Sequence, residues 1–352
     1  MALLKFNGVG ISGIAACIPR KEIDNYNYST YFSPEDVGKI IEKIGVRKRR
    51  FADSKTCASD LCTAAAEALF TDMQIDKSEI DALLFVSQTP DYRMPATSAI
   101  LQNRLGLSKS IITLDINMGC SAFLYALSVS FSFLSQENIK KVLILNGETR
   151  SKVYSAKDRK TAFLFGDAGV AALVEKGDCF QKSFFSFNTD GAQESLIKIN
   201  AGGYRNPSSV ETIKERVVDD SGNIRSDEQG YMDGDSVFSF VAREVPKDVR
   251  GIIDFAGLEK EQIDYFVFHQ ANQFMNQHLV KKLRLDERKV PVSIDKYGNT
   301  SSVSVPLTIV SELKGKLKPG MILCLIAFGV GVSWGSAIVP MCHCHLSKIV
   351  EI

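Results

Sequence analysis

Short apolar runs with strand character alternate with longer helical stretches along the whole chain. The runs ALLFV, ITLDI and KVLILNGE lie in the first half, and YFVF and MILCLIAFG lie in the second. The stretch SAFLYALSVSFSFL, which follows ITLDI and a Gly-containing turn, has the length of a helix and no charged residue. Short apolar runs bounded by turn residues favour buried strands, and strands that alternate with helices favour an α/β fold.

The second half of the chain resembles the first in three places and in the same order. IDKSEIDALLFV matches LEKEQIDYFVF, and IITLDINMGCSAFLYA matches VPVSIDKYGNTSSVSVPLT. KVLILNGE and FGDAGVAALV then match MILCLIAFG and FGVGVSWGSAIV. Chance similarity between short apolar runs is the alternative, but three ordered matches favour gene duplication. We therefore expect two similar sheets around shared helices, with a strand at residues 290–294 before the turn of Asn299.

The duplication predicts an N-terminal half at residues 1–177 and a C-terminal half at residues 178–352. Residues 180–235 have no counterpart in the first half and contain clusters of Gly, Asn, Ser and Asp. Long excursions of this kind in compact domains often carry substrate contacts. We expect this insertion to contribute to a binding site.

Composition places the chain among globular proteins and excludes a disordered or fibrous one. Of 352 residues, 45% are hydrophobic and 24% are charged, and the net charge is only +1. No overall charge attracts nucleic acid or membrane. The eight cysteines lie mostly in apolar contexts and the N-terminus lacks a leader pattern, so we expect a cytoplasmic protein with reduced thiols. The charge-free windows at 116–136 and 321–342 predict a buried helix or hairpin rather than membrane spans.

Cys120 is the first candidate for chemistry. It follows the strand ITLDI through a short turn and precedes the apolar helix. A thiol at a helix N-terminus faces unpaired N–H groups and the positive end of the helix dipole, which stabilise its thiolate. A thiolate is the nucleophile of acyl transfer, and the same N–H groups can receive an oxyanion. A buried structural cysteine is the alternative.

His269 and Asn299 join Cys120 through the internal repeat. His269 ends the run YFVF, where a single histidine is more often a satisfied polar residue than a catalyst. Asn299 lies in the turn that corresponds to the turn of Cys120. A pseudo-twofold arrangement of the halves would bring both turns to one crevice, with His269 nearby. The three side chains therefore predict a shared site.

The motifs DINMGCSAFLYAL, HQAN, GNTSSVSVP and FGVGVSWGSAIV together resemble the β-ketoacyl-acyl-carrier-protein synthase III family of the thiolase superfamily. The segments IGVRKRR and DRKTAFLFGD support the resemblance, which runs from about Gly8 to Val339. It implies the thiolase fold, a duplicated five-layered αβαβα arrangement that usually dimerises. It implies a homodimeric acyltransferase with acyl-carrier protein as partner and an acyl thioester as substrate, without a cofactor or metal held by the protein.

The resemblance also implies roles for individual residues. Cys120 would take the acyl group, and His269 and Asn299 would hold the carbonyl oxygen of a malonyl thioester while CO₂ leaves. The backbone N–H groups of Cys120 and Val330 would receive the oxyanion of the condensation step. The remaining expectations are substrate contacts at Arg159, Met94 and Phe328 and carrier-protein docking at Lys281, Lys282 and Arg284.

Some positions depart from the family's pattern. Lys39 stands where the family often has a Trp that stacks on adenine, and Phe274 stands where it commonly has a carrier-docking arginine. Met94 replaces a frequent Phe, so the acyl preference stays open. The tail at residues 341–352, MCHCHLSKIVEI, extends past the usual end of the family, and its adjacent Cys and His residues lack the spacing of a zinc site.

Three other functions remain possible at the level of sequence. A non-condensing acyltransferase would pass the acyl group to a hydroxyl or amine, and release of CO₂ from a malonyl thioester separates it from a condensing enzyme. A cysteine hydrolase has the same order of Cys, His and Asn, but the duplication argues against it. A non-catalytic partner of another synthase is disfavoured because Cys120, His269 and Asn299 are all present. The sequence leaves open the acyl group, its coenzyme A or carrier-protein donor, and the pathway.

Overall fold

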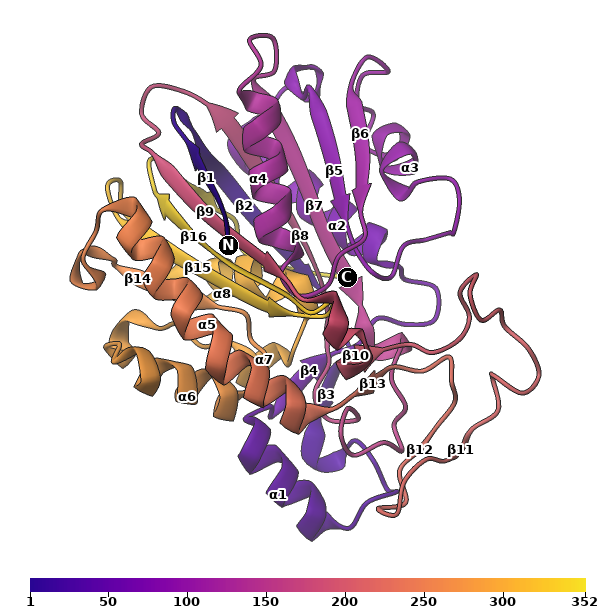
Figure 1. The fold of residues 1–352 in the computed structure, drawn as a ribbon. Coiled ribbons are helices and arrows are strands. Elements are labelled where there is room, and N and C mark those ends of the chain that lie inside the picture. The colour runs from indigo at the N-terminus through magenta and orange to yellow at the C-terminus, as the bar shows by residue number, and fades with distance from the viewer.

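The computed structural model describes residues 1–352, which form two mixed β-sheets packed on either side of two helices (Figure 1). The first sheet has the strand order β17–β2–β8–β7–β5–β6, and β18 also pairs with β2. Its strands are β2 (Val9–Ile18), β5 (Ala82–Val86), β6 (Ile112–Ile116), β7 (Lys141–Thr149), β8 (Asp167–Lys176), β17 (His345–Leu346) and β18 (Val350–Glu351). The second sheet has the order β1–β9–β16–β15–β14, with strands β1 (Ala2–Phe6), β9 (Ser183–Thr189), β14 (Tyr265–Phe268), β15 (Ile322–Gly329) and β16 (Ser333–Pro340).

The two sheets share one topology. In the first sheet β5 is parallel to β7, β7 is antiparallel to β8, and β8 is antiparallel to β2. In the second sheet β14, β15, β16 and β9 follow each other with the same sequence of directions. The duplicated pattern of apolar runs therefore corresponds to a duplicated arrangement of strands.

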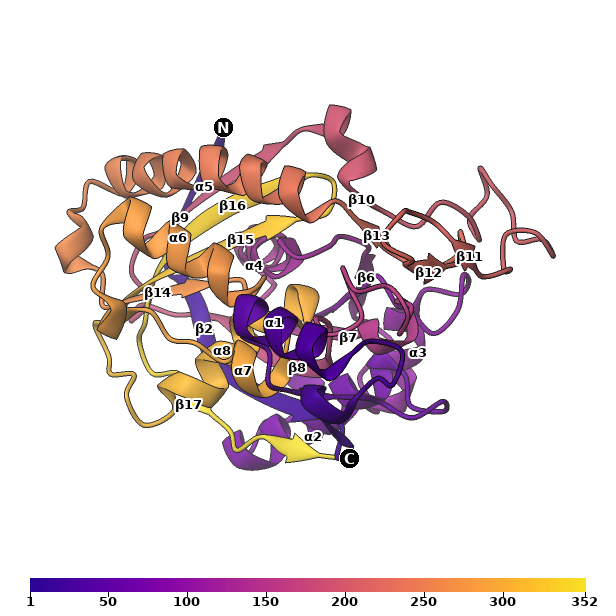
Figure 2. The ribbon, with the colours of Figure 1, turned by 90° about the horizontal axis from the view of Figure 1, so that it is seen from below.

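Helices form the other three layers. The central layer contains α4 (Ala122–Leu134) and α8 (Ser304–Leu313), which pack against strands of both sheets. The outer face of the first sheet carries α2 (Ala58–Met73) and α3 (Thr97–Arg104), and the outer face of the second carries α5 (Gly234–Ala256) and α6 (Gln273–Leu283) (Figures 1 and 2). Two further helices, α1 (Pro34–Ile44) and α7 (Ile294–Tyr297), lie below the sheets in Figure 1.

The core explains the unbroken apolar runs in the sequence. Strands β5, β7 and β15 are buried on both faces by helices, so they lack the alternation of a half-exposed strand. Helix α4 carries no charge because it lies between two sheets, where Phe131 packs edge-on against Phe6 and Phe185. The first charge-free window contains α4 and the second contains β15 and β16, and none of the helices combines the length and apolar character needed to cross a bilayer.

The prediction of a strand at residues 290–294 is wrong. Residues 291–293 have no regular structure, and α7 begins at Ile294. Pro291 has no N–H for a sheet ladder, and the N–H of Ser293 donates instead to the Gln270 side chain. The second sheet consequently ends at β14 and has no equivalent of β6.

The ends of the chain cross between the halves. Strand β1 adds an edge to the second sheet by pairing with β9. The tail after Met341 adds β17 and β18 to the first sheet, parallel to β2. The insertion contains the short pairs β10 (Ile197–Lys198) with β13 (Tyr231–Met232) and β11 (Arg216–Val217) with β12 (Ile224–Arg225), and it protrudes at the right of Figures 1 and 2. The remaining pair is β3 (Glu22–Asp24) with β4 (Lys48–Arg50).

Candidate active site

Cys120 lies in the turn between β6 and α4, two residues before the helix begins. Its thiol is almost fully buried, with 8% of the residue exposed. The backbone of the FGVG turn packs closely on it: a Cβ added to Gly329 would lie 2.6 Å from the Cys120 Sγ, and one added to Gly119 would lie 2.7 Å from the Val330 Cβ. Glycine at both positions is thus required by the close approach of the two turns.

His269 follows β14 and is fixed by two hydrogen bonds. Its backbone N–H donates to the Ile326 carbonyl at 2.7 Å, and its Nδ1 lies 2.7 Å from the Ser304 hydroxyl. That hydroxyl oxygen also accepts the Gln270 N–H at 3.2 Å, and its own proton is available to donate to Nδ1. We assign the Nε2–H tautomer on this basis, which leaves Nε2–H as a donor toward the pocket.

Asn299 is held through both ends of its amide. Its Nδ2 donates to the Ala271 carbonyl at 3.2 Å, and its Oδ1 accepts the Ser301 N–H at 2.8 Å. The second N–H of Nδ2 remains for another acceptor. Ser301 has a left-handed φ of 55°, and its hydroxyl lies 3.8 Å from the Cys120 Sγ.

The surroundings of Cys120 favour its thiolate. Burial raises the pKa of the thiol, but the His269 imidazole, through its charge and a hydrogen bond, outweighs this effect together with the Arg150 guanidinium and the Ser301 hydroxyl. The net result is a pKa lowered from 9.0 to about 7. A large fraction of the thiol is therefore ionised near neutral pH, as a nucleophilic cysteine requires.

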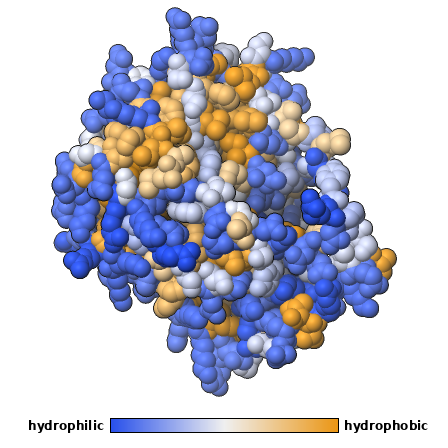
Figure 3. Space-filling model, in the orientation of Figure 1, coloured by the Kyte–Doolittle hydropathy of each residue, from blue (hydrophilic) through white to orange (hydrophobic).

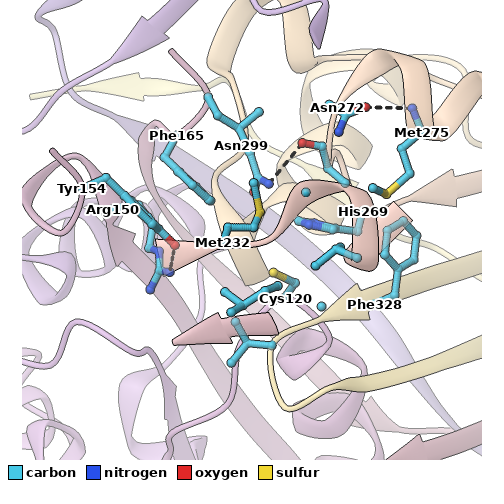
Figure 4. Close-up of a pocket in the computed structure, with 17 residues that line it drawn as sticks. Cys120, Arg150, Tyr154, Phe165, Met232, His269, Asn272, Met275, Asn299 and Phe328 are labelled. Atoms are coloured by element: carbon cyan, nitrogen blue, oxygen red, sulfur yellow. Dashed lines mark hydrogen bonds between the residues drawn. The ribbon is translucent and has the colours of Figure 1, made fainter. Parts of the chain in front are cut away.

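One pocket is lined by all three side chains (Figure 4). Phe328, expected as a substrate contact, lines it and packs edge-on against the His269 ring at 5.5 Å. Met232 of the insertion lines it as well. The other apolar lining residues include Leu164, Phe165, Ile197, Val237 and Met275. Such a wall excludes water from a reactive acyl-enzyme.

A wider outer cavity continues from this pocket, since both are lined by Leu164, Met232 and Met275. Arg159 lines the outer cavity, together with Lys43 of α1 and Lys160. Phe274 lies in the same outer cavity, where the family commonly has an arginine. Lys39 is instead exposed and paired with Glu35 at 2.7 Å, away from the lining.

The remaining predicted residues lie elsewhere. Met94 does not line the pocket within one chain, because its side chain is 77% exposed. Lys281, Lys282 and Arg284 are exposed at the C-terminal end of α6, whereas the outer cavity is lined by Phe274 at its N-terminal end. An eleven-residue helix spans about 16 Å at 1.5 Å per residue, so this basic cluster is separated from the cavity by the length of α6.

Sequence reasoning missed a buried polar group beside Cys120. Glu148 and Arg150 follow the apolar part of β7, and Arg150 lines the pocket with only 5% of its surface exposed. Arg150 donates to the Tyr154 hydroxyl at 2.7 Å, and the Tyr154 ring stacks on Phe165 at 3.9 Å. A charged residue directly after a buried strand was the available signal, because strand ends in α/β sheets border binding sites.

The duplicated sheets, the central helices and the buried thiol beside an imidazole and an amide define a thiolase-fold enzyme of the acyl-cysteine class. Residues 114–191 match the family described as 3-oxoacyl-[acyl-carrier-protein (ACP)] synthase III, and residues 253–341 match the family of its C-terminal part. The chain belongs to the 3-oxoacyl-acyl-carrier-protein synthase III family, also named β-ketoacyl-acyl-carrier-protein synthase III.

Individual relatives cover nearly the whole chain. A β-ketoacyl-acyl-carrier-protein synthase III of Caldanaerobacter subterraneus is 32% identical over 94% of this chain and 97% of its own. A putative 3-oxoacyl-acyl-carrier-protein synthase 3 of Campylobacter jejuni is 34% identical over 98% of both. The crystal structure of a 3-oxoacyl-(acyl-carrier protein) synthase from Burkholderia xenovorans matches with a TM-score of 0.93 and 38% identity over 100% of this chain and 99% of its own.

Proposed function

We propose that this protein catalyses the decarboxylative condensation of an acyl thioester with malonyl-acyl-carrier protein. The observation that carries the proposal is the convergence of Cys120, His269 and Asn299 on one apolar pocket in a chain of this family. Acyl transfer without condensation needs a nucleophile but no second site for an enolate. In the acyl-enzyme, which has no Cys120 thiolate to favour a charged imidazole, a neutral histidine and an amide side by side suit an enolate better than a hydrolytic water.

The first half-reaction loads the enzyme. The Cys120 thiolate attacks the carbonyl carbon of the acyl thioester, the carbon–sulfur bond to the donor breaks, and the donor leaves as a thiolate that takes a proton from water. The N–H groups of Cys120 and Val330 have no acceptor within the chain, which suits them to the oxyanion of this step. The product is an acyl thioester on Cys120.

The second half-reaction forms the carbon–carbon bond. The thioester oxygen of the malonyl group accepts hydrogen bonds from His269 Nε2–H and Asn299 Nδ2–H, and the carboxylate leaves as CO₂. The electron pair that remains forms an enolate, which attacks the acyl carbonyl. Collapse of the tetrahedral intermediate releases the Cys120 thiolate and a 3-oxoacyl carrier protein. Neutral donors stabilise the enolate without protonating its carbon.

The donor and partner contacts are part of the same proposal. Arg159 and Lys160 in the outer cavity provide positive charge for the phosphates of coenzyme A or phosphopantetheine. Lys281, Lys282 and Arg284 dock the acidic carrier protein at the end of α6. The reaction uses no cofactor or metal of the protein's own, since the substrates bring their activating thioesters. The eight free cysteines fit a reducing, cytoplasmic setting.

We propose that the active form is a homodimer joined along β6. This edge strand carries Ile112 and Leu114, which are 41% and 40% exposed although apolar. Figure 3 shows apolar surface on the half of the molecule that contains α4, β5 and β6. An exposed apolar edge strand calls for a partner strand. The exposed Met94 would then extend toward the pocket of the partner subunit. Analytical sedimentation tests this proposal. We expect the wild type to sediment as a dimer and the double variant Ile112→Lys, Leu114→Lys to sediment as a monomer.

Two variants test the reaction. Cys120→Ala abolishes the acyl adduct, whereas Asn299→Ala keeps the adduct and loses CO₂ release by about 100-fold or more, the usual effect of removing one donor to a developing oxyanion. Intact-mass measurement follows the first reaction, and CO₂ release from malonyl-acyl-carrier protein follows the second. An adduct that persists in Cys120→Ala contradicts the assignment of the nucleophile. Wild-type enzyme that loads an acyl group but never releases CO₂ is an acyltransferase.

A further inference from the structure

Arg150 places a buried cation in the pocket that receives the acyl group. It follows β7 and lies in the same pocket as Cys120, with 5% exposure. Figure 4 shows Arg150 and Tyr154 on one side of Cys120 and His269 on the other. The imidazole and the guanidinium therefore lie on opposite sides of the sulfur, and we take the side of Arg150 as the one that receives the acyl chain.

The guanidinium has few partners within the protein. One Nη2 N–H donates to the Tyr154 hydroxyl at 2.7 Å, and Nη1 reaches the Gln88 Oε1 only at 3.5 Å. Nε is buried and has no partner. A guanidinium has five N–H donors, so most of them remain unpaired.

The nearby carboxylate of Glu148 does not accept the unpaired N–H groups of Arg150. Glu148 accepts the Gln88 N–H at 3.0 Å and the Thr89 hydroxyl at 3.1 Å, with the Ser302 hydroxyl at 3.4 Å. It forms no ion pair with Arg150 within 4 Å, unlike Asp158, which pairs with Arg225 at 2.9 Å. Burial raises the pKa of Glu148, although Arg150 acts in the opposite direction. The carboxyl thus interacts with the guanidinium through charge but does not accept any of its N–H groups.

The position of the guanidinium is nevertheless fixed. Tyr154 stacks on Phe165 with an interplanar angle of 3°, and the Arg150 Cζ lies 5.2 Å and 5.6 Å from the centres of these two rings. A rigid, buried donor with free N–H groups selects for ligands that supply an acceptor, because a ligand without one leaves the donor unpaired. A purely alkyl acyl chain is such a ligand.

We propose that Arg150 selects acyl groups that carry an oxygen acceptor, a carboxylate or a hydroxyl, beyond the thioester carbonyl. The inference rests on the proposed acylation of Cys120 and adds the substrate class. Nε–H and the free Nη N–H groups bind the oxygen, while Tyr154 holds the guanidinium in place. The covalent step is unchanged, and the oxygen serves only for recognition.

Three four-carbon thioesters of coenzyme A test the proposal with matched chain length: succinyl carries a carboxylate, 3-hydroxybutyryl carries a hydroxyl, and butyryl carries neither. The rate of adduct formation on Cys120, divided by thioester concentration, is measured by intact mass for wild type, Arg150→Met and Arg225→Met. In wild type and in Arg225→Met, one oxygenated thioester reacts about 10- to 100-fold faster than butyryl, the range of one charged hydrogen bond. In Arg150→Met this preference is lost, because the oxygenated thioesters lose more rate than butyryl, beyond any common loss from the weaker stabilisation of the Cys120 thiolate. Whichever of the succinyl and 3-hydroxybutyryl thioesters reacts faster shows whether Arg150 selects a carboxylate or a hydroxyl.

Each other outcome has a defined meaning. Wild-type enzyme that prefers butyryl overturns the selection by Arg150 and leaves acylation standing. Arg150→Met that slows all three thioesters by one factor also overturns it, since Arg150 then acts only on the Cys120 thiolate. Absence of any Cys120 adduct, from these thioesters and from the same acyl groups carried on acyl-carrier protein, overturns the proposed function and this inference with it. Circular dichroism and the thermal midpoint of each variant establish that Arg150→Met is folded in these comparisons.

Discussion

Replacing His269 with Ala removes the strongest of the influences that lower the pKa of Cys120. With a pKa of about 7, half of the thiol is ionised at pH 7, whereas a pKa at the ordinary 9.0 leaves about 1%. The thiolate population therefore falls about 50-fold. The more basic thiolate is about eightfold more reactive, given a Brønsted coefficient of about 0.45 over two pH units. The expected loss of alkylation rate at pH 7 is thus only about sixfold.

The pH dependence of the alkylation rate distinguishes the variant from the wild type more clearly than the rate at pH 7. The pseudo-first-order rate of iodoacetamide addition rises with pH as the thiolate forms, so its midpoint reports the pKa of Cys120. We expect a midpoint near pH 7 in the wild type and near pH 9 or above in His269→Ala. Peptide mass spectrometry assigns the reaction to Cys120, and Cys120→Ala gives the background from the other cysteines. His278→Ala, a histidine of α6 outside the pocket, is the matched control and keeps the wild-type midpoint.

An unchanged midpoint in His269→Ala would refute the electrostatic argument. The low pKa would then arise from the position of Cys120 before α4 and from Arg150, not from the imidazole. A midpoint near pH 9 in the wild type would refute it more broadly, because burial would then cancel the combined effect of the groups around the sulfur.

Three further variants test the surroundings of the site and the core. Gly329→Ala should block acylation while the protein still folds, because the new Cβ would lie 2.6 Å from the Cys120 Sγ; intact mass and thermal unfolding measure the two effects. Ser304→Ala should lower CO₂ release about tenfold and leave the acyl adduct, because the His269 tautomer loses its partner at 2.7 Å. Phe131→Ala should reduce the free energy of unfolding by about 3–5 kcal/mol in urea titration, because the ring is fully buried between the sheets.

The sequence predicted the parts of the fold that depend on local pattern. The apolar runs gave the strands buried on both faces, and the internal repeat gave two sheets with a shared central layer. The strand predicted at residues 290–294 from the match between the two halves of the chain is absent, because Pro291 and the hydrogen bond of Ser293 to Gln270 oppose it. Pairing of the tail with β2 also had no local signal, since short edge strands are determined by the partner available to them.

Some residues of the candidate site could likewise be predicted from the sequence, and others could not. Cys120 and Asn299 lie in turns that the repeat relates, so their position follows from pattern and chemistry. Arg150 was not found, because its burial depends on contacts with Tyr154 and Gln88 that are formed only in the folded chain. Ser301 was overlooked for the same reason, since only its left-handed backbone brings its hydroxyl to the thiol.

The crossing of the two chain ends has a consequence for biosynthesis. During translation, β1 has no partner until β9 has been made, more than 170 residues later. Strand β2 keeps one edge open until β17 and β18 have been made. Neither half completes its sheet as an independent cotranslational unit, because the second sheet needs β1 from the first half and the first sheet needs β17 and β18 from the second.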